Sequence, residues 1–346
     1  MSSGKVITLR DVAEKAGVSV MTVSRVLRNQ RNISTETKDK VNKIAAELGY
    51  RPNPMVSALM SYRRSARQTV TYSSLGFITS FATRQEWREN KLYNEFFEGA
   101  KAGADRHGFQ LEEFWSREPG MSTERLSEIL YYRNVPGLLI APLPVSQGHL
   151  RLDWAKFSAV TIGYSLARPP LHRAVNHQFR SMRLAVRQLR KVGYKRMGLA
   201  MAASYDSRVD HQWSGSFLAE QVRLDPGDRV PLYLVEDEEW NEANFLKWFR
   251  KNKPDVIISQ QKDILQWLGK IKVQVPDDVG FVHLNCPDDS GEFAGIYQNG
   301  RVIGEVAIDF LVAMVQRNER GVPSLAHSIL VEGTWVDGKT IRKSPR

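Results

Sequence analysis

The sequence has a single cysteine, Cys286, in 346 residues. One thiol cannot form an internal disulfide or supply a multi-cysteine zinc site. There is no run of about 18 apolar residues, which excludes a membrane-spanning helix. The first residues, MSSGKVITLRDVAEKAG, lack the apolar segment of a secretory signal. We therefore expect a cytoplasmic protein that makes no membrane contact.

The signatures of common enzyme classes are also missing. The seven histidines form no H-E-x-x-H motif, and there is no G-x-S-x-G elbow and no Walker loop. Cys286 has no activating base close to it in the sequence. We predict that the chain is not an enzyme, that it has no catalytic or metal-ligating residues, and that it needs no cofactor.

Positive charge is concentrated at one end of the chain. The formal net charge is +11, and residues 1–67 contribute +8, since they hold 13 Lys and Arg against 5 Asp and Glu. The other 279 residues carry only +3. A basic end on a nearly neutral body predicts a polyanionic partner, either a nucleic acid or an anionic membrane surface. From charge alone, a solvated basic face without a partner is the alternative.

Three short helices are predicted in the first 50 residues. Capping residues and glycine stops place them at 8–17, 19–27 and 34–49. In the first of them, Thr8 and Asp11 have the spacing of a capping box. Because only a few residues link the first two helices, the pattern is that of a helix-turn-helix.

The second of these helices has apolar residues on both faces. Three apolar side chains face the core of the unit, whereas the outer face holds Val20, Met21, Ser24, Arg25 and Arg28. A recognition helix in the major groove has such a face, because arginine pairs bidentately with guanine and an aliphatic side chain meets a thymine methyl group. The alternative is that Val20 and Met21 pack under another part of the same protein.

The segment at 7–53, ITLRDVAEKAGVSVMTVSRVLRNQRNISTETKDKVNKIAAELGYRPN, resembles the DNA-binding head of the LacI/GalR family of bacterial transcription regulators. The matching pieces are T-L-x-D-V-A-x-x-A-G-V-S, T-V-S-R-V-L and I-A-A-x-L-G-Y-x-P-N. In that family the two residues after the turn serine read base edges, here Val20 and Met21. An arginine near the end of that helix, here Arg25, contacts a base. Hydroxyl groups near the helix N-termini suit phosphates.

The predicted DNA-binding residues include part of a hinge segment at 51–71. Pro54 suits the first position of a short helix, which is marginal alone because helix nucleation is unfavourable. The resemblance implies that two such helices of a dimer pair in the minor groove, where Leu59 opens a base step; a plain linker is the alternative. The full set of predicted DNA-binding residues is Thr8, Leu9, Arg10, Ser19, Val20, Met21, Thr22, Ser24, Arg25, Arg28, Asn32, Ser34, Thr37, Asn53, Val56 and Leu59.

From residue 72 onward, strand-like runs alternate with helical ones. This alternation predicts parallel sheets with helices on both faces, and the number of strand-like runs predicts two lobes. Residues 72–346 resemble the effector domain of the same family, which is like a periplasmic sugar-binding protein. The predicted fold class is α + α/β: a helix-turn-helix head at 1–50, a hinge helix and linker at 51–71, and a two-lobed periplasmic-binding-protein-like α/β effector domain at 72–346.

Ligands of such folds bind between the lobes, at the carboxyl ends of the strands. The predicted effector-binding residues are Phe81, Arg208, Trp213, Gln260, Asn285 and Gln298. Family members commonly have an acidic residue where this chain has Asn285, and an Asn-Asp pair where it has SQQKD at 259–263. The expected effector is a sugar or sugar derivative; because these polar residues are altered, a modified or uncharged sugar, a non-sugar ligand, and no effector at all stay open.

These patterns favour a homodimeric, sequence-specific regulator in the nucleoid, a repressor by preference, gated by a small-molecule effector. A dimer would bind a pseudo-palindromic site in double-stranded DNA. The C-terminal residues contain no leucine heptads, so a coiled-coil tetramer is not expected. Two alternatives stay open: a sugar-binding or sugar-processing module whose basic head serves only for docking or solubility, and an architectural DNA-binding protein without a ligand.

Overall fold

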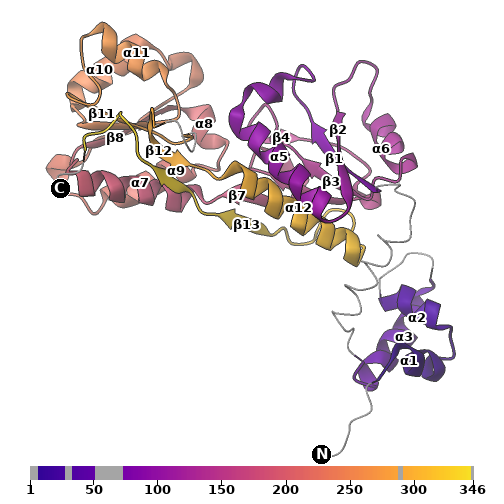
Figure 1. Cartoon of the computed structure of the whole chain (residues 1–346). Coiled ribbons are helices and arrows are strands. Elements are labelled where there is room, and N and C mark those ends of the chain that lie inside the picture. The colour runs from indigo at the N-terminus through magenta and orange to yellow at the C-terminus, as the bar shows by residue number, and fades with distance from the viewer. Residues whose placement is uncertain (1–6, 28–32, 51–72, 287–290, 344–346) are drawn as a thin grey trace, which may run out of the picture.

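The computed structural model describes residues 7–27, 33–50, 73–286 and 291–343. Figure 1 shows a small helical unit at the N-terminal end and a larger part that consists of two lobes. We call the helical unit at 7–50 the head. The first lobe comprises residues 73–176 and 300–331, and the second lobe comprises residues 177–298 and 334–343.

The head is built from α1 (Leu9–Ala16), α2 (Val20–Leu27) and α3 (Thr35–Glu47). The predicted capping box is present, and Gly17 ends α1 with a φ of 64°, in the left-handed region that glycine adopts easily. The predicted three helices are thus confirmed. Their small buried side chains form one core, which consists of Val12, Ala13, Ala16, Val23, Val26, Val41 and Ala45.

The first lobe contains a six-stranded parallel sheet with the strand order β13-β7-β5-β3-β1-β2. Its strands are β1 (Ser73–Thr79), β2 (Phe109–Trp115), β3 (Gly137–Ile140), β5 (Ser158–Ile162), β7 (His172–Asn176) and β13 (Ser328–Val331). A small second sheet pairs β4 (Gly148–His149) with β6 (Leu166–Arg168). The helices of this lobe are α5 (Lys91–Arg106), α6 (Thr123–Tyr132) and α12 (Gly300–Arg317), with 3-10 turns η1 (Glu86–Glu89) and η2 (Trp154–Lys156).

The second lobe repeats this plan with the strand order β14-β12-β11-β10-β8-β9. Its strands are β8 (Met197–Ala202), β9 (Tyr233–Val235), β10 (Val256–Ser259), β11 (Gly280–His283), β12 (Ala294–Tyr297) and β14 (Thr334–Val336). Its helices are α7 (Gln178–Val192), α8 (Ala203–Ser207), α9 (Gln212–Gln221), α10 (Glu242–Asn252) and α11 (Asp263–Lys270), with 3-10 turns η3 (Pro226–Asp228) and η4 (Asp237–Glu239). The prediction of parallel strands holds in this sheet except for β14, which runs antiparallel to β12.

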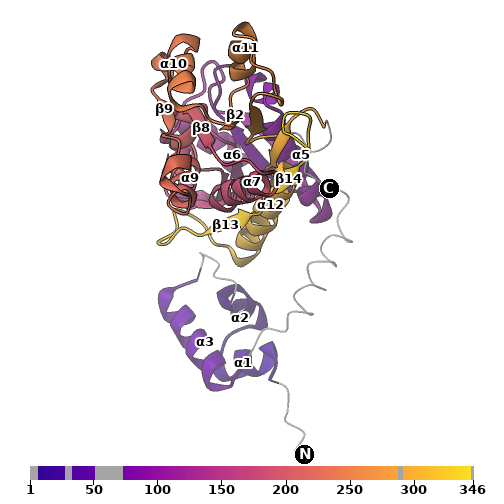
Figure 2. The same cartoon turned by 90° about the vertical axis from the view of Figure 1, so that its left-hand side faces the viewer.

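Helices cover both faces of the second sheet, as predicted. One core lies between this sheet and the helices α7 and α9, and another lies between the sheet and the helices α10 and α11. The turned view in Figure 2 shows the second lobe from its side, with α7 and α9 below the strands and α10 and α11 above them. Each sheet is therefore buried on both faces, which explains the nearly continuous apolar runs in the sequence.

The chain passes between the lobes three times: from β7 to α7, from β12 to α12, and from β13 to β14. One buried amide connects all three passages. The Nδ2 atom of Asn176 donates to the carbonyl oxygens of Gln298 at 3.4 Å and Val331 at 3.1 Å, while its Oδ1 atom accepts from Ser181 at 3.0 Å. These passages form the only covalent links between the two lobes, so we call them the hinge of the body.

Within the first lobe, α5 and α12 pack with their backbones in contact. A Cβ atom at Gly304 would lie 2.1 Å from the carbonyl oxygen of Phe96, and one at Gly99 would lie 1.9 Å from the carbonyl oxygen of Arg301. Only glycine fits such distances. The helix that follows the second passage, α12, is therefore held rigidly against the helix that follows β1.

We expect Gly304→Ala to lower the free energy of unfolding by about 2 kcal/mol or more, because the two helix backbones must separate to admit the methyl group. Urea unfolding measures the change. Gly215→Ala in α9 is the matched control, since nothing lies within 4 Å of a Cβ there. It should stabilise the chain by about 0.5–1 kcal/mol through helix propensity. Equal unfolding midpoints for the two variants would contradict the close packing.

Candidate nucleic-acid interface and interlobe contact

The outer face of α2 is open, as the pattern of its residues predicts. Val20 is 43% exposed and Met21 is 63% exposed, whereas Val23 and Val26 on the opposite face are 0% and 4% exposed. Arg25 is exposed as well. Two bare aliphatic side chains and a guanidinium group thus share the solvent side of one short helix. This combination suits the floor of a major groove, which offers both thymine methyl groups and guanine acceptors.

Hydroxyl groups mark the start of each head helix. Ser19 Oγ accepts from the Thr22 backbone N–H at 3.0 Å, and Ser34 Oγ accepts from the Thr37 backbone N–H at 3.3 Å. Thr8 bonds with Asp11 in the same way. All three predicted hydroxyl positions are therefore helix caps on an exposed surface. The N-terminus of a helix favours negative charge, so each cap is suited to a phosphate.

The other predicted head residues fall into two groups. Arg10 is exposed, Ser24 is half-buried, and Leu9 is half-buried against the head core. Val20, Met21 and Arg25 therefore lie on the exposed face of α2, with the exposed Ser19 beside them at its start. The remaining predicted DNA-binding residues lie outside the described part of the chain: Arg28, Asn32, Asn53, Val56 and Leu59.

The two lobes touch through Arg208, the residue that follows α8 in the second lobe. Its guanidinium group donates to the carbonyl oxygens of Leu143 at 2.7 Å and Pro144 at 2.9 Å. It also donates to the Tyr93 hydroxyl at 2.9 Å. All three acceptors belong to the first lobe, where Leu143 and Pro144 follow β3 and Tyr93 lies in the first turn of α5. We call this set of bonds the arginine latch.

Further contacts join the same parts of the two lobes. Ser207 Oγ donates to Ser146 Oγ at 3.2 Å. Tyr164, which follows β5 in the first lobe, forms a hydrogen bond with the side chain of Gln212 in the second lobe. Burial raises the pKa of its hydroxyl, and this hydrogen bond lowers that pKa in part. The corner between α8 and α9 thus docks onto the loops at the carboxyl ends of β3 and β5.

This corner is held in shape by a buried carboxyl group. Asp206 is 0% exposed. It accepts from the Ser214 backbone N–H at 3.0 Å, from the Ser214 hydroxyl at 2.6 Å and from His211 Nδ1 at 3.1 Å. Asp206 thus accepts hydrogen bonds from the first turn of α9, although it lies in α8. These bonds hold the turn between the two helices, which contains Arg208. Both Asp210 and His211 have a φ of 56°, a left-handed conformation that such support makes tolerable.

The comparisons with known proteins identify the head. Residues 8–53 match the profile described as "Bacterial regulatory proteins, lacI family". Over 53 residues, the chain is 57% identical to the HTH-type transcriptional regulator GalS of Salmonella typhimurium, which covers 15% of this chain and 16% of that protein. Residues 8–53 thus form a LacI-family DNA-binding head. The relatives that the chain matches are transcription regulators.

The likeness to LacI-family proteins extends over nearly the whole chain. The HTH-type transcriptional regulator GntR of Escherichia coli (strain K12) is 25% identical over 314 residues, 90% of this chain and 87% of that protein. The transcriptional regulator CelR in its cellobiose complex has 19% identity and a TM-score of 0.57, covering 96% of this chain and 99% of that one. The lac repressor dimer bound to operator and the anti-inducer ONPF has 20% identity and a TM-score of 0.53, covering 97% and 99%. These structures confirm the predicted fold class.

Several predicted effector residues lie just after the carboxyl ends of strands. Phe81 follows β1 and packs with its ring centroid 5.9 Å from that of Tyr93, the acceptor of the latch. Gln260 and Asn285 follow β10 and β11 and are half-buried. Arg208 follows α8 and donates to the hydroxyl of the same Tyr93. The structure thus brings Phe81 and Arg208 to one shared neighbour.

Two of the predicted residues are buried in the fold. Gln298 is 6% exposed and donates from Nε2 to the Leu284 carbonyl at 2.9 Å, so it braces the passage into α12. Trp213 is 0% exposed and belongs to the core beneath α7 and α9. Its indole Nε1 has no hydrogen-bond partner among the described residues. In this structure the Trp213 ring is thus part of the lobe's interior.

Sequence reasoning missed the partners of the latch. Leu143 and Pro144 act through backbone carbonyl oxygens, which every residue has, so no side-chain pattern could mark them. Tyr93 lies within a predicted helix, and only its contact with Arg208 distinguishes it from other tyrosines. Asp206 has no local sequence signal either, because its partner Ser214 lies eight positions further along the chain.

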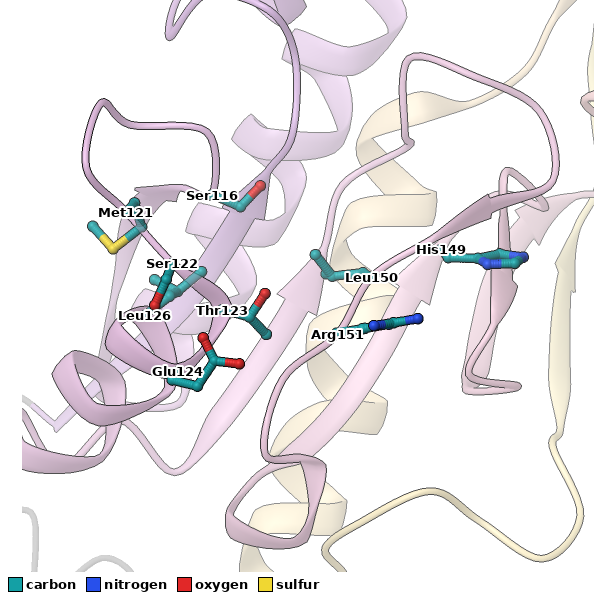
Figure 3. Close-up of a pocket in the computed structure, with 9 residues that line it drawn as sticks. All are labelled: Ser116, Met121, Ser122, Thr123, Glu124, Leu126, His149, Leu150 and Arg151. Carbon is teal, nitrogen blue, oxygen red and sulfur yellow. The ribbon is translucent and has the colours of Figure 1, made fainter.

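A shallow depression of about 450 Å³ lies in the first lobe and not between the lobes. Residues at the start of α6 line one side of it, including Thr123 and Glu124, and residues 149–151 line the other. Figure 3 shows that the His149 and Arg151 side chains extend away from Thr123 and Glu124. Because its polar groups do not converge on one point, we do not assign a ligand to this depression.

Two groups near the ends of β11 have altered proton affinities. Burial, together with the positive charge of Lys262, lowers the pKa of His283 to about 4. Burial raises the pKa of the Cys286 thiol to about 11. Both side chains are therefore neutral at pH 7 and unsuited to nucleophilic or acid–base roles there. Among the described residues there is no cluster of three potential metal ligands and no helix long and apolar enough to cross a membrane.

We expect Asp206→Ala to lower the free energy of unfolding by about 2–3 kcal/mol, since it leaves the buried Ser214 N–H and hydroxyl without their acceptor. Chemical unfolding followed by tryptophan fluorescence measures the loss. The exposed residue Glu238 supplies the control, because Glu238→Ala removes an acid from the surface and should change stability by less than about 0.5 kcal/mol. If both variants were equally stable, Asp206 would not support the corner.

Proposed function

We propose that this protein is a LacI-family regulator, a dimeric repressor whose hold on DNA is gated by a small molecule that binds between its lobes. The observation that carries the proposal is the outer face of α2, where Val20, Met21 and Arg25 are exposed together. A surface helix that needed only solubility would not keep two aliphatic side chains there. A groove of DNA is a surface that accepts all three.

In the proposed complex, α2 lies in the major groove and its neighbours contact the backbone. Val20 and Met21 meet thymine methyl groups, and Arg25 pairs with a guanine. Ser19, Thr22, Ser34 and Thr37 lie at helix starts that receive phosphates, as do Thr8, Leu9 and Arg10 in the first helix. Asn53, Val56 and Leu59 act in the minor groove as part of a hinge helix that orders on DNA.

A dimer and a gating ligand are supported by the proteins that share the fold. The lac repressor structure is a dimer bound to its operator, and the CelR structure is a complex with cellobiose. For this chain we infer a homodimer on a pseudo-palindromic site, with a sugar or sugar derivative as effector. Phe81, Arg208, Gln260, Asn285, Gln298 and Trp213 are the residues proposed for that site or its immediate support.

The gating mechanism uses the hinge of the body. An effector that changes the angle between the lobes also changes the spacing of the two heads in a dimer. The hinge helix predicted at 51–71, a different segment from the hinge of the body, is marginally stable, so this change in spacing unfolds it and DNA contact is lost. A coupling free energy of about 1–3 kcal/mol suffices for a 5- to 150-fold change in affinity.

Selection of bound duplexes from a random pool tests the proposal directly. Enrichment of one symmetric sequence, bound by two chains in analytical ultracentrifugation, is expected. A sugar-binding module with a basic docking head would enrich no sequence. An architectural protein would bind its DNA without any response to small molecules. Equal affinity for all duplexes at physiological ionic strength would overturn the proposal.

We expect Arg25→Ala to relax the sequence preference at one position of each half-site and to cost about 1–3 kcal/mol of discrimination there. Binding to a panel of single-base variants of the selected site, measured by fluorescence anisotropy, gives the profile. Arg63 lies in the predicted hinge segment at 51–71, where we expect it to contact a phosphate. Arg63→Ala is therefore the control, because the loss of a phosphate contact should weaken binding evenly across the panel and reduce its salt dependence. Matching profiles for Arg25→Ala and the wild type would contradict docking through α2.

A further inference from the structure

The charge of Arg208 is held by uncharged oxygen atoms. Its three acceptors are two backbone carbonyl groups and one phenol, at 2.7–2.9 Å. Among the described residues, no carboxylate forms an ion pair with it. The half-buried guanidinium thus makes three hydrogen bonds through Nη1 and Nη2, and all three are to neutral oxygen atoms.

The two carbonyl groups are arranged like the two oxygen atoms of an anion. Leu143 and Pro144 are consecutive residues, and their oxygens accept from Nη2 and Nη1 of the same guanidinium group. Nη1 and Nη2 are also the atoms through which arginine binds a carboxylate or a phosphate with two hydrogen bonds. A ligand anion in the same place would provide the same two bonds and would also neutralise the charge.

The acidic side chains near this position are engaged elsewhere. Asp237 accepts from the Ser204 backbone N–H at 3.2 Å, and Asp263 accepts from Trp240 Nε1 at 3.1 Å. Both carboxylates therefore bond to groups of the second lobe, and neither forms an ion pair with Arg208.

Two ammonium groups add positive charge on the other side of the strand ends. Lys262 lies 4.3 Å from the centroid of the Phe293 ring. Burial raises the pKa of Cys286; the ammonium groups of Lys262 and Lys91 oppose that rise, and the Glu292 carboxylate adds to it. Lys91 belongs to the first lobe and Lys262 to the second. Both lobes therefore place positive charge at these strand ends, beside one carboxylate of the second lobe.

We propose that the effector is a small organic anion whose carboxylate or phosphate oxygens displace the Leu143 and Pro144 carbonyl groups from Arg208. This inference rests on the proposed function, because it names the class of ligand for the same interlobe site. Displacement replaces a direct bond between the lobes by one that runs through the ligand. The latch and the effector therefore compete for one guanidinium group, and binding changes how the lobes meet.

Isothermal titration calorimetry with matched pairs of compounds tests the ligand class on the full chain. The pairs are gluconate and sorbitol, galacturonate and galactose, glucose 6-phosphate and glucose, and succinate and succinamide. The anion of at least one pair should bind at least about tenfold more tightly than its neutral partner. Carboxylates and phosphates are separated by which pair responds. Equal or tighter binding of the neutral members, or no binding of any anion, overturns the inference.

Variants then locate the anion. Arg208→Gln should weaken the binding of the responding anion at least about tenfold, and Arg208→Lys should recover part of it, since the charge returns without the fork. Arg187→Gln removes an exposed arginine from α7 and should leave the affinity unchanged. Tyr93→Phe removes one bond of the latch but keeps the guanidinium, so it should tighten anion binding. Unchanged binding in Arg208→Gln places the anion elsewhere and overturns the inference.

The outcomes also separate this inference from the proposed function. Selection of DNA needs no effector, so an enriched symmetric site together with a neutral ligand would refute only the anionic class. A chain that enriches no site would refute the regulator itself, whatever it binds between the lobes. Thermal unfolding of each variant without ligand shows whether a loss of binding reflects a loss of fold.

Discussion

Three passages of the chain between two lobes constrain everything that the body can do. All three meet at one buried amide, because Asn176 binds the carbonyl oxygens of Gln298 and Val331. Beside it, Asn299 Nδ2 donates to the Glu332 carbonyl at 2.7 Å and to Thr334 Oγ1 at 3.0 Å. These bonds join the three passages to one another. Any motion of one lobe relative to the other must therefore bend or twist the chain at this hinge.

The close pairing of α5 with α12 decides where motion is possible. Their backbones touch at Gly99 and Gly304, so a displacement of the helix that follows the hinge must carry the first lobe with it. The first lobe then behaves as one rigid body, and so does the second, whose sheet is covered on both faces. A ligand that binds between the two lobes, as proposed, would change the angle between them. Two rigid bodies that can meet at different angles form the kind of two-state element on which allosteric coupling depends.

Much of this architecture could be predicted from the sequence, but unevenly. The segment that forms β2 has a strand's composition and the one that forms α7 has a clean amphipathic period, so local pattern indicates both elements. By contrast, α12 is buried against several elements, so its apolar residues lie on most sides and give no clear stripe. The edge strand β13 is half-exposed and short, which weakens its signal. Local pattern reveals an element only when one of its faces meets water.

The candidate sites divide in the same way. Val20 and Met21 could be singled out because they break the amphipathic pattern of α2, and a broken pattern is visible in sequence. The acceptors of Arg208 could not, since Leu143 and Pro144 contribute only backbone atoms that the fold brings within reach. The sequence could therefore indicate that Arg208 belongs to a site. It could not indicate which groups bind the guanidinium.

The strength of the arginine latch fits the task proposed for it. A hydrogen bond to a charged group contributes about 1.5–3 kcal/mol, and allosteric coupling in proteins amounts to about 1–3 kcal/mol. A much stronger link, such as a buried ion pair across the lobes, would resist any weakly bound metabolite. A link made of neutral carbonyl groups holds the lobes together, yet it yields to an anion that offers the same geometry with charge added. The absence of a protein carboxylate on Arg208, among the described residues, is thus what would allow a small molecule to control how the lobes meet.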